Sequence, residues 1–414
     1  MRALRIDTRR FERDFGRLYE IGATGDGGVH RPALGEKHLE ARRWFRERIV
    51  ADGLEFCEDG AGNHGARLSC GDPEAPTLLL GSHLDSVPSG GRFDGTLGVL
   101  AAYEAVRIVR DAGIELSVHL EAIDFTDEEG TLVGLLGSRA LAGTLGAEEL
   151  DDPRGGAEAL EQGLRRAGLN REGLLRARRE PASLAGFLEL HIEQGPRLTA
   201  AGAAIGVVRS IVGIGSFALR FGGRADHAGT TPMDQRRDAG LGAASLMVQA
   251  TEMVRADFDD CVVNFGKLGL SPGAHNIVPA AADLALEFRA PDDERLRSLE
   301  SALLELCRDC AQRLGLDLEV RQQIAIPPVP CAAPVQRAFV AACETLDLPH
   351  ISLTSGAGHD TGALAAVCPA GMIFIPSTGG SHSPREFADW EACVNGANAL
   401  LLAALRLAEE GETP

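Results

Sequence analysis

The sequence predicts an α/β protein in which a mixed, mostly parallel sheet flanked by helices is interrupted by an inserted α+β domain. Short apolar runs that end in polar clusters alternate with helical segments in the outer parts of the chain, which is typical of parallel strands. Between about residues 206 and 328 the order becomes strand, helix, strand, strand, helix, strand. We therefore expect an outer domain over 1–209 and 329–414, and an inserted domain over 210–328.

The first sixty residues are predicted to be helical, with Leu39, Trp44, Phe45 and Ile49 mainly on one face. Two short strands are expected within 61–80, the second being an apolar run that ends just before His83 and Asp85. A helix is predicted to begin after Asp94 and Gly95. One imidazole and two carboxylates are therefore placed around the end of a buried strand.

Two further strands of the outer domain also end in polar residues. The strand predicted over 117–126 runs into Asp127, Glu128 and Glu129, and residues 147–180 form a polar helical segment. The strand over 186–195 alternates, so that Glu189, His191 and Glu193 share one face.

The inserted segment is expected to form four strands with two helices on one face, a ferredoxin-like arrangement. Its helices are predicted over 238–255 and 294–314. A proline-rich linker then returns the chain to a helix, a glycine-rich loop over 355–362, and an apolar strand over 372–376. That strand is followed by His382, and an amphipathic helix over 386–410 closes the chain.

The composition of the chain argues against several classes of binding partner. The formal net charge is −19, which disfavours nucleic acids and anionic membranes. No apolar run is long enough to cross a bilayer, and residues 1–10 lack the apolar core of a secretion signal. The nine scattered cysteines suit a reducing cytosol. We therefore expect a cytoplasmic protein that acts on a small molecule.

Histidines and carboxylates follow the strands of the outer domain and are absent from these positions in the inserted one. They are His83, Asp94, Glu128, Glu129, His191 and His382. Any one of them alone is more simply explained as a hydrogen-bonded surface group. Together at one rim, they indicate a pair of divalent ions bridged by one carboxylate.

These motifs resemble the amidase and carbamoylase branch of the M20 metallopeptidase family. The similar stretches are HLD at 83–85, DG at 94–95, DEEG at 127–130, ELHIEQG at 189–195 and GSHSP at 380–384. HAGTTPM at 227–233, HNIVP at 275–279, EFR at 287–289 and GHD at 358–360 fit the same branch. The branch includes N-carbamoyl-L-amino acid hydrolases, β-ureidopropionases and allantoate amidohydrolases.

The resemblance implies a role for each matching residue of the outer domain. His83 and His191 would hold one metal, Glu129 and His382 the other, and Asp94 would bridge them. Glu128 would be the general base, and Asp85 would orient His83. The ions would be zinc, manganese, cobalt or nickel, two per subunit.

The same resemblance implies that the inserted domain is a lid through which two chains form a homodimer. His227 of the lid would reach the partner subunit's site. The substrate-binding residues would be Gln194, Asn276, Arg289, Gly358 and His359. Without the resemblance, Arg289 is as readily a strand-end salt bridge and His227 a turn residue.

The expected reaction is hydrolysis of a C–N bond in a small ureido or amide substrate that carries a carboxylate, most simply an N-carbamoyl-L-amino acid. A two-metal site supplies hydroxide at neutral pH, and Glu128 moves the proton to the leaving nitrogen. An allantoate amidohydrolase, or an aminoacylase or dipeptidase of the family, are alternatives, as is a non-catalytic carboxylate-binding protein. Residues 131–136 lack the arginine usual after the glutamate pair, and residues 212–217 lack the one expected in an allantoate enzyme.

Overall fold

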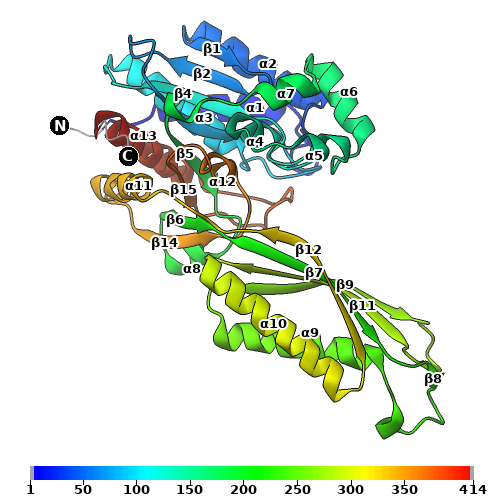
Figure 1. Ribbon diagram of the computed structural model, residues 1–414. Coiled ribbons are helices and arrows are strands. Elements are labelled where there is room, and N and C mark those ends of the chain that lie inside the picture. Colours follow the sequence, from blue (N-terminus) through cyan, green and yellow to red (C-terminus); the bar gives the residue numbers. More distant parts are fainter. Residues whose placement is uncertain (1–3, 411–414) are drawn as a thin grey trace. The chain divides into compact units, whose positions relative to one another are not determined.

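The computed structural model describes residues 4–410 and divides into two compact units. The first unit comprises 1–209, 331–353 and 358–414, and the second comprises 210–330 and 354–357 (Figure 1). Residues 1–3, where the sequence predicts no secretion signal, and residues 411–414 lie outside the described part of the chain. Each unit has its own hydrophobic core.

The sheet of the first unit has the strand order β1-β2-β4-β3-β5-β15-β6. Its strands are β1 (Glu55–Glu58), β2 (His64–Leu68), β3 (Thr77–His83), β4 (His119–Phe125), β5 (Leu184–Ile192), β15 (Ala370–Ile375) and β6 (Ile205–Ile211). The four central strands β4, β3, β5 and β15 are parallel, and the flanking pairs are antiparallel. A further strand, β14 (His350–Ser355), pairs with β6. The predicted mixed sheet with a parallel centre is confirmed.

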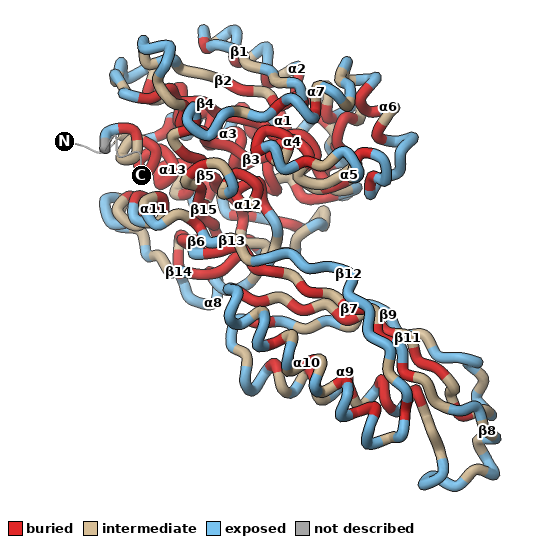
Figure 2. The backbone as a smooth tube through the Cα atoms, in the orientation of Figure 1, coloured by how far each residue is buried: buried red, intermediate tan, exposed pale blue. Residues whose placement is uncertain are grey.

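Helices cover both faces of this sheet. They are α1 (Thr8–Glu20), α2 (Glu36–Ala51), α3 (Thr96–Asp111), α4 (Leu136–Ala142), α5 (Ala147–Asp151), α6 (Ala157–Ala167), α7 (Arg171–Arg176), α8 (Arg197–Ala201), α11 (Ala333–Leu346), α12 (Asp360–Leu364) and α13 (Trp390–Glu410). Leu78 and Leu80 of β3 pack with α3 and α13, whereas Leu79 packs on the opposite side with α4 and α12. Figure 2 shows the central strands buried along their length. A strand buried on both faces needs a continuous apolar run, which explains the pattern seen in the sequence.

The expectation that the chain is helical to about residue 60 was wrong at its end. Glu55–Glu58 forms strand β1, which pairs antiparallel with β2. Its four residues are exposed or half-buried, so no periodic apolar pattern marks it. Pairing with β2 at the sheet edge, rather than local propensity, determines its conformation.

The second unit is built on an antiparallel sheet of order β12-β7-β11-β9. Its elements are β7 (Gly213–Gly222), α9 (Ala239–Asp257), β9 (Val262–Ser271), β11 (Ala281–Ala290), α10 (Asp293–Arg313) and β12 (Asp317–Ile326), with the short strands β8 (Asp226–His227), β10 (Ile277–Val278) and β13 (Val329–Pro330). Alternate residues of β7 and β11 are buried, and this face packs against α9 and α10. The prediction of four strands with two helices on one face is confirmed.

Capping residues explain where the two helices of the second unit begin. Asp238 precedes α9 and accepts a hydrogen bond from the backbone N–H of Leu241 at 3.1 Å. Asp292 precedes α10 and accepts from the backbone N–H of Arg295 at 2.8 Å. Each carboxylate accepts a hydrogen bond from a backbone N–H that the first turn leaves unpaired. Its negative charge also interacts favourably with the positive end of the helix dipole. Across the described residues, no helix has the length and apolar character needed to cross a membrane.

Candidate metal centre

The candidate site lies where the parallel strands of the first unit end. His83 is the last residue of β3, and His191 is the next to last of β5, the neighbouring parallel strand. Glu128 and Glu129 follow β4, and His382 follows β15. Parallel strands end at one edge of a sheet, so the order of the strands brings these residues to the same rim.

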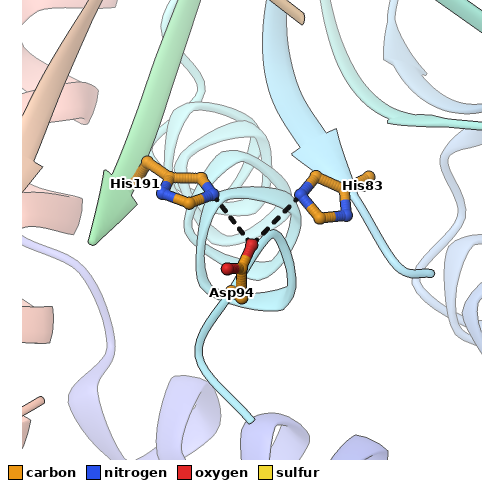
Figure 3. Close-up of side chains that lie close together, drawn as sticks. All are labelled: His83, Asp94 and His191. Atoms are coloured by element: carbon orange, nitrogen blue, oxygen red, sulfur yellow. Dashed lines mark hydrogen bonds and ion pairs between the residues drawn. The ribbon is translucent and has the colours of Figure 1, made fainter. Parts of the chain in front are cut away.

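Asp94 lies between the two strand-end histidines, as Figure 3 shows. Its Oδ1 atom is 3.4 Å from Nε2 of His83 and 3.1 Å from Nε2 of His191. The next residue, Gly95, has φ +61°, and a Cβ atom there would lie 2.4 Å from Cε1 of His83. Glycine therefore lets the start of α3 approach the imidazole closely enough to present Asp94.

A second cluster shares the same carboxylate. Nε2 of His382 lies 3.2 Å from Oε2 of Glu129 and 3.9 Å from Oδ2 of Asp94. The side chains of the first group are buried, whereas that of His382 is 54% exposed. The described residues thus form two groups with the spacing of metal ligands, and Asp94 belongs to both.

The ring nitrogens of the two buried histidines have distinct roles. Nδ1 of His83 lies 3.1 Å from the backbone oxygen of Asp85, and Nδ1 of His191 lies 2.9 Å from that of Ile192. A carbonyl oxygen only accepts, so each Nδ1 carries a proton, and Nε2 is the ring atom that each histidine turns toward Asp94. Nε2 of His83 is buried without a hydrogen-bond partner. An unpaired imidazole nitrogen beside carboxylates is the donor set of a divalent transition metal.

The carboxylate of Asp85 holds the turn that carries the two glutamates. Its two oxygens accept from the backbone N–H groups of Glu128 and Glu129, each at 3.3 Å. It is 3.8 Å from Nδ1 of His83, so Asp85 contacts that ring more closely through its backbone oxygen. Asp85 thereby positions candidate ligands from β3 and from the loop after β4.

Glu128 faces the first group without belonging to either. Its Oε2 atom is 3.5 Å from Nε2 of His83, and its side chain is 10% exposed. Burial, together with the nearby charges of Asp360, Glu129 and Asp94, raises the pKa of Glu128 well above its usual range. A carboxyl group that holds a proton readily is suited to general acid–base chemistry.

The other site residues proposed for the first unit differ in how closely they approach the candidate metal centre. Nε2 of Gln194 donates to Oδ2 of Asp94 at 2.8 Å and to Oγ of Ser381 at 2.7 Å. The His359 ring is buried with its centroid 4.6 Å from that of His191, and burial lowers its pKa well below the usual value. Gly358 is exposed in the loop before α12 and has open space around it.

His227 and Asn276 lie together in the second unit. His227 on β8 pairs with Ile277 on β10, and the backbone oxygen of Asn276 accepts from the N–H of Ala228 at 3.0 Å. The exposed His227 ring accepts at Nδ1 from the N–H groups of Gly229 and Thr230. A neutral ring held this way carries its proton on Nε2, which is left to donate.

Arg289 is paired within the second unit. Its guanidinium donates to Oε1 of Glu287 at 3.0 and 2.9 Å, and to the backbone oxygen of Gly356 at 2.6 Å. It remains 30% exposed. A substrate carboxylate at this position would therefore compete with Glu287 for the guanidinium.

Two carboxylates near the centre were assigned no role from the sequence. Glu386 is buried and accepts from the backbone N–H groups of Phe93 and Asp94 at 3.1 and 3.2 Å. Asp127 is buried and accepts from three consecutive backbone N–H groups, those of residues 132–134. Both lie within four residues of a predicted ligand, which is the one sequence signal that points to them.

Two metal-ligand groups that share a carboxylate, at the edge of a parallel sheet, define a class of α/β metal-dependent hydrolases. Comparison with known proteins gives the family: the profile of Peptidase family M20/M25/M40 matches residues 79–406. The chain belongs to this family.

Relatives and solved structures cover nearly the whole length of the chain. An N-carbamoyl-L-amino acid amidohydrolase of Geobacillus stearothermophilus is 37% identical over 404 residues, which is 96% of this chain and 98% of the relative. An allantoate amidohydrolase of Bacillus subtilis is 30% identical and covers 92% of this chain and 93% of its own. A crystal structure of an amidase of the hydantoinase/carbamoylase family from Burkholderia multivorans superposes with a TM-score of 0.90 at 32% identity, covering 98% of both chains. The suspected resemblance to the amidase and carbamoylase branch is confirmed.

Proposed function

We propose that this protein hydrolyses the C–N bond of an N-carbamoyl-L-amino acid or a related ureido acid with the help of two divalent metal ions. The observation that carries the proposal is the pair of ligand groups sharing Asp94, with the buried carboxyl of Glu128 beside them. The relatives named as carbamoyl-amino acid amidohydrolases over nearly the full length support the substrate class.

The two groups would each hold one ion, with His83 and His191 at the first and Glu129 and His382 at the second. Bound divalent ions polarise a substrate carbonyl and activate water at neutral pH. Zinc, manganese, cobalt and nickel all accept this mixture of imidazole and carboxylate ligands. Gln194 would fix Asp94 between them through the hydrogen bond to Oδ2.

Proton transfer is the task of Glu128. It accepts a proton from the attacking water and returns it to the leaving nitrogen, which would otherwise depart as a strongly basic anion. Its burial excludes bulk water from this exchange, and its place one residue from Glu129 keeps it beside the reacting groups.

The second unit would act as a lid and as the dimer interface. Edge strands β9 and β12 carry exposed apolar side chains, Val262, Leu268, Val320 and Ile326, which suit pairing between chains. His227 of the partner subunit would donate from Nε2 to the developing oxyanion. Asn276 and Arg289 would hold the substrate carboxylate, and Gln194, Gly358 and His359 would also contact the substrate. The nine free thiols fit a cytosolic location.

The test is an activity screen of purified protein with each of the four metals. N-carbamoyl-L-amino acids, ureidopropionate, allantoate and dipeptides are compared by kcat/KM. The Glu128→Gln variant, purified in the same way, reports any contaminating activity. We expect the carbamoyl amino acids to give the highest kcat/KM and the metal-free protein to be inactive. A higher kcat/KM for dipeptides or allantoate would refute the proposed substrate class. Activity of the metal-free protein would refute the proposed metal-dependent mechanism.

A further inference from the structure

A pocket lined largely by arginines lies in the first unit, among residues that take no part in the metal centre. It is formed by α2, by the β1–β2 connection and β2, and by the end of α6, and its volume is about 190 Å³. The charged or titratable residues lining it are Arg42, Arg43, Arg46, Arg166, His64 and Glu58. Four guanidinium groups around one small pocket are unexpected in a chain whose net charge is −19.

Internal ion pairs neutralise only part of this positive charge. Nε of the buried Arg42 contacts Oδ2 of Asp124 at 2.8 Å, and Glu58 lies 3.7 Å from Nε2 of His64. Glu58 is the one acidic side chain among the described residues that line the pocket. Arg166 donates from Nη1 to the backbone oxygen of Leu34 at 2.7 Å, which leaves its charge uncompensated. The positive charges of Arg43, Arg46 and Arg166 are therefore opposed by a single carboxylate among the lining residues.

Several nitrogen donors around the pocket are uncommitted. Arg43 is exposed and makes no hydrogen bond or ion pair with any described residue, and Arg46 lies over the Phe56 ring at 4.8 Å. Nη2 of Arg42 and Nδ1 of His64 are buried without hydrogen-bond partners. Arg42 is 2% exposed, so its unpaired nitrogen is costly unless another group satisfies it. The exposed guanidinium of Arg43 and the unsatisfied nitrogen of Arg42 are donors, and they point to an absent acceptor.

We propose that this pocket binds a small phosphate-bearing dianion, either inorganic phosphate or the phosphate group of a small monoester. Guanidinium groups present parallel N–H donors that match the oxygens of phosphate, and several of them together favour a doubly charged, tetrahedral ligand. Pockets for drug-sized ligands span roughly 300–1,000 Å³, so a volume of about 190 Å³ fits a ligand smaller than a nucleotide. The pocket is thus a second ligand site, separate from the metal centre.

The test is calorimetric titration of the metal-loaded protein at constant ionic strength, which keeps screening of the charges equal. The ligands are inorganic phosphate, glycerol phosphate and succinate, and the proteins are the wild type and Arg43→Gln/Arg46→Gln. The matched control is Arg9→Gln/Arg13→Gln, which removes two exposed arginines of α1 and changes the net charge equally. All four side chains are exposed, so neither variant disturbs the core.

We expect the pocket variant to bind phosphate at least tenfold more weakly than the wild type, and the control variant to bind it as the wild type does. If phosphate binds more tightly than glycerol phosphate, the ligand of the pocket is the free ion. If glycerol phosphate binds more tightly, the ligand is a phosphate monoester. Phosphate binding that survives unchanged in the pocket variant belongs to another site, such as the metals, and overturns the proposal. Equal weakening in the control, or succinate binding as tightly as phosphate, also overturns it.

Discussion

The two adjacent glutamates of the metal centre can be separated by one matched pair of substitutions. Glu129 lies in the group with Asp94 and His382, whereas Glu128 lies in neither group and contacts His83 at 3.5 Å. Replacing each in turn by glutamine keeps the size of the side chain and removes its charge and its ability to take a proton. Glu128→Gln should therefore impair turnover, and Glu129→Gln should impair metal binding.

The magnitudes follow from these positions. A positioned general base contributes about two to four orders of magnitude, so Glu128→Gln should raise the activation barrier by roughly 2.7–5.4 kcal/mol. Its KM and metal content should stay near those of the wild type, because both ligand groups remain intact. Glu129→Gln leaves the second group with only Asp94 and His382, so bound metal should fall from two ions per chain toward one.

Mass spectrometry of dialysed protein gives the metal content, and steady-state kinetics with an N-carbamoyl amino acid give kcat and KM. Melting temperatures of both variants confirm that they are folded. These role assignments are refuted if Glu128→Gln loses metal while Glu129→Gln keeps it, since the roles are then exchanged. They are also refuted if Glu128→Gln retains more than about a tenth of the wild-type kcat.

Three further outcomes are expected. Arg289→Lys should raise KM for substrates with a free carboxylate and leave amidated substrates unaffected, because lysine lacks the planar fork; equal effects on both substrates would remove Arg289 from the pocket. Mixing inactive Glu128→Gln with inactive His227→Ala after subunit exchange should restore about a quarter of the sites if His227 acts across a dimer, and none if it acts within its own chain. His38 is buried and accepts the N–H of Leu34 at Nδ1, and burial holds its pKa well below the usual value. As pH falls, this histidine therefore binds a proton in the unfolded chain before it does in the folded one. The free energy of unfolding is lowered by about 1.4 kcal/mol at pH 5.5 as a result. Other buried groups titrate over the same range, so urea unfolding at pH 8 and 5.5 should show a fall in stability that is about 1.4 kcal/mol larger in the wild type than in His38→Gln.

The parts of the fold that the sequence predicts are those with a two-sided burial pattern. β3 and β4 are apolar throughout because helices cover both of their faces, and the residues just beyond them are therefore recognisable as site candidates. The starts of helices α9 and α10 can also be predicted from the sequence, because an aspartate caps each of them. In these elements local pattern and tertiary environment agree.

The sequence could not predict features that depend on contacts between distant residues. β1 is four half-exposed or exposed residues whose conformation is set by pairing with β2. Glu386 supports Asp94 from a position 292 residues further along the chain, and nothing in either local sequence links them. Asp85 contacts His83 through its backbone oxygen and the backbone of Glu128 through its carboxylate. This pair of contacts is likewise apparent only in the folded structure.

The order of the candidate ligands along the chain has a consequence for biosynthesis. His83, Asp94, Glu129 and His191 all precede the second unit, whereas His382 and strand β15 follow it. Ribosomes add roughly 5–20 residues per second, so about 190 residues separate the synthesis of His191 from that of His382 by some 10–40 s. During that time the first ligand group is complete, but β5 lacks its neighbour β15 and leaves an apolar strand edge unpaired. The nascent chain is thus exposed to aggregation until its C-terminal segment emerges, and chaperone dependence should be greatest over that interval.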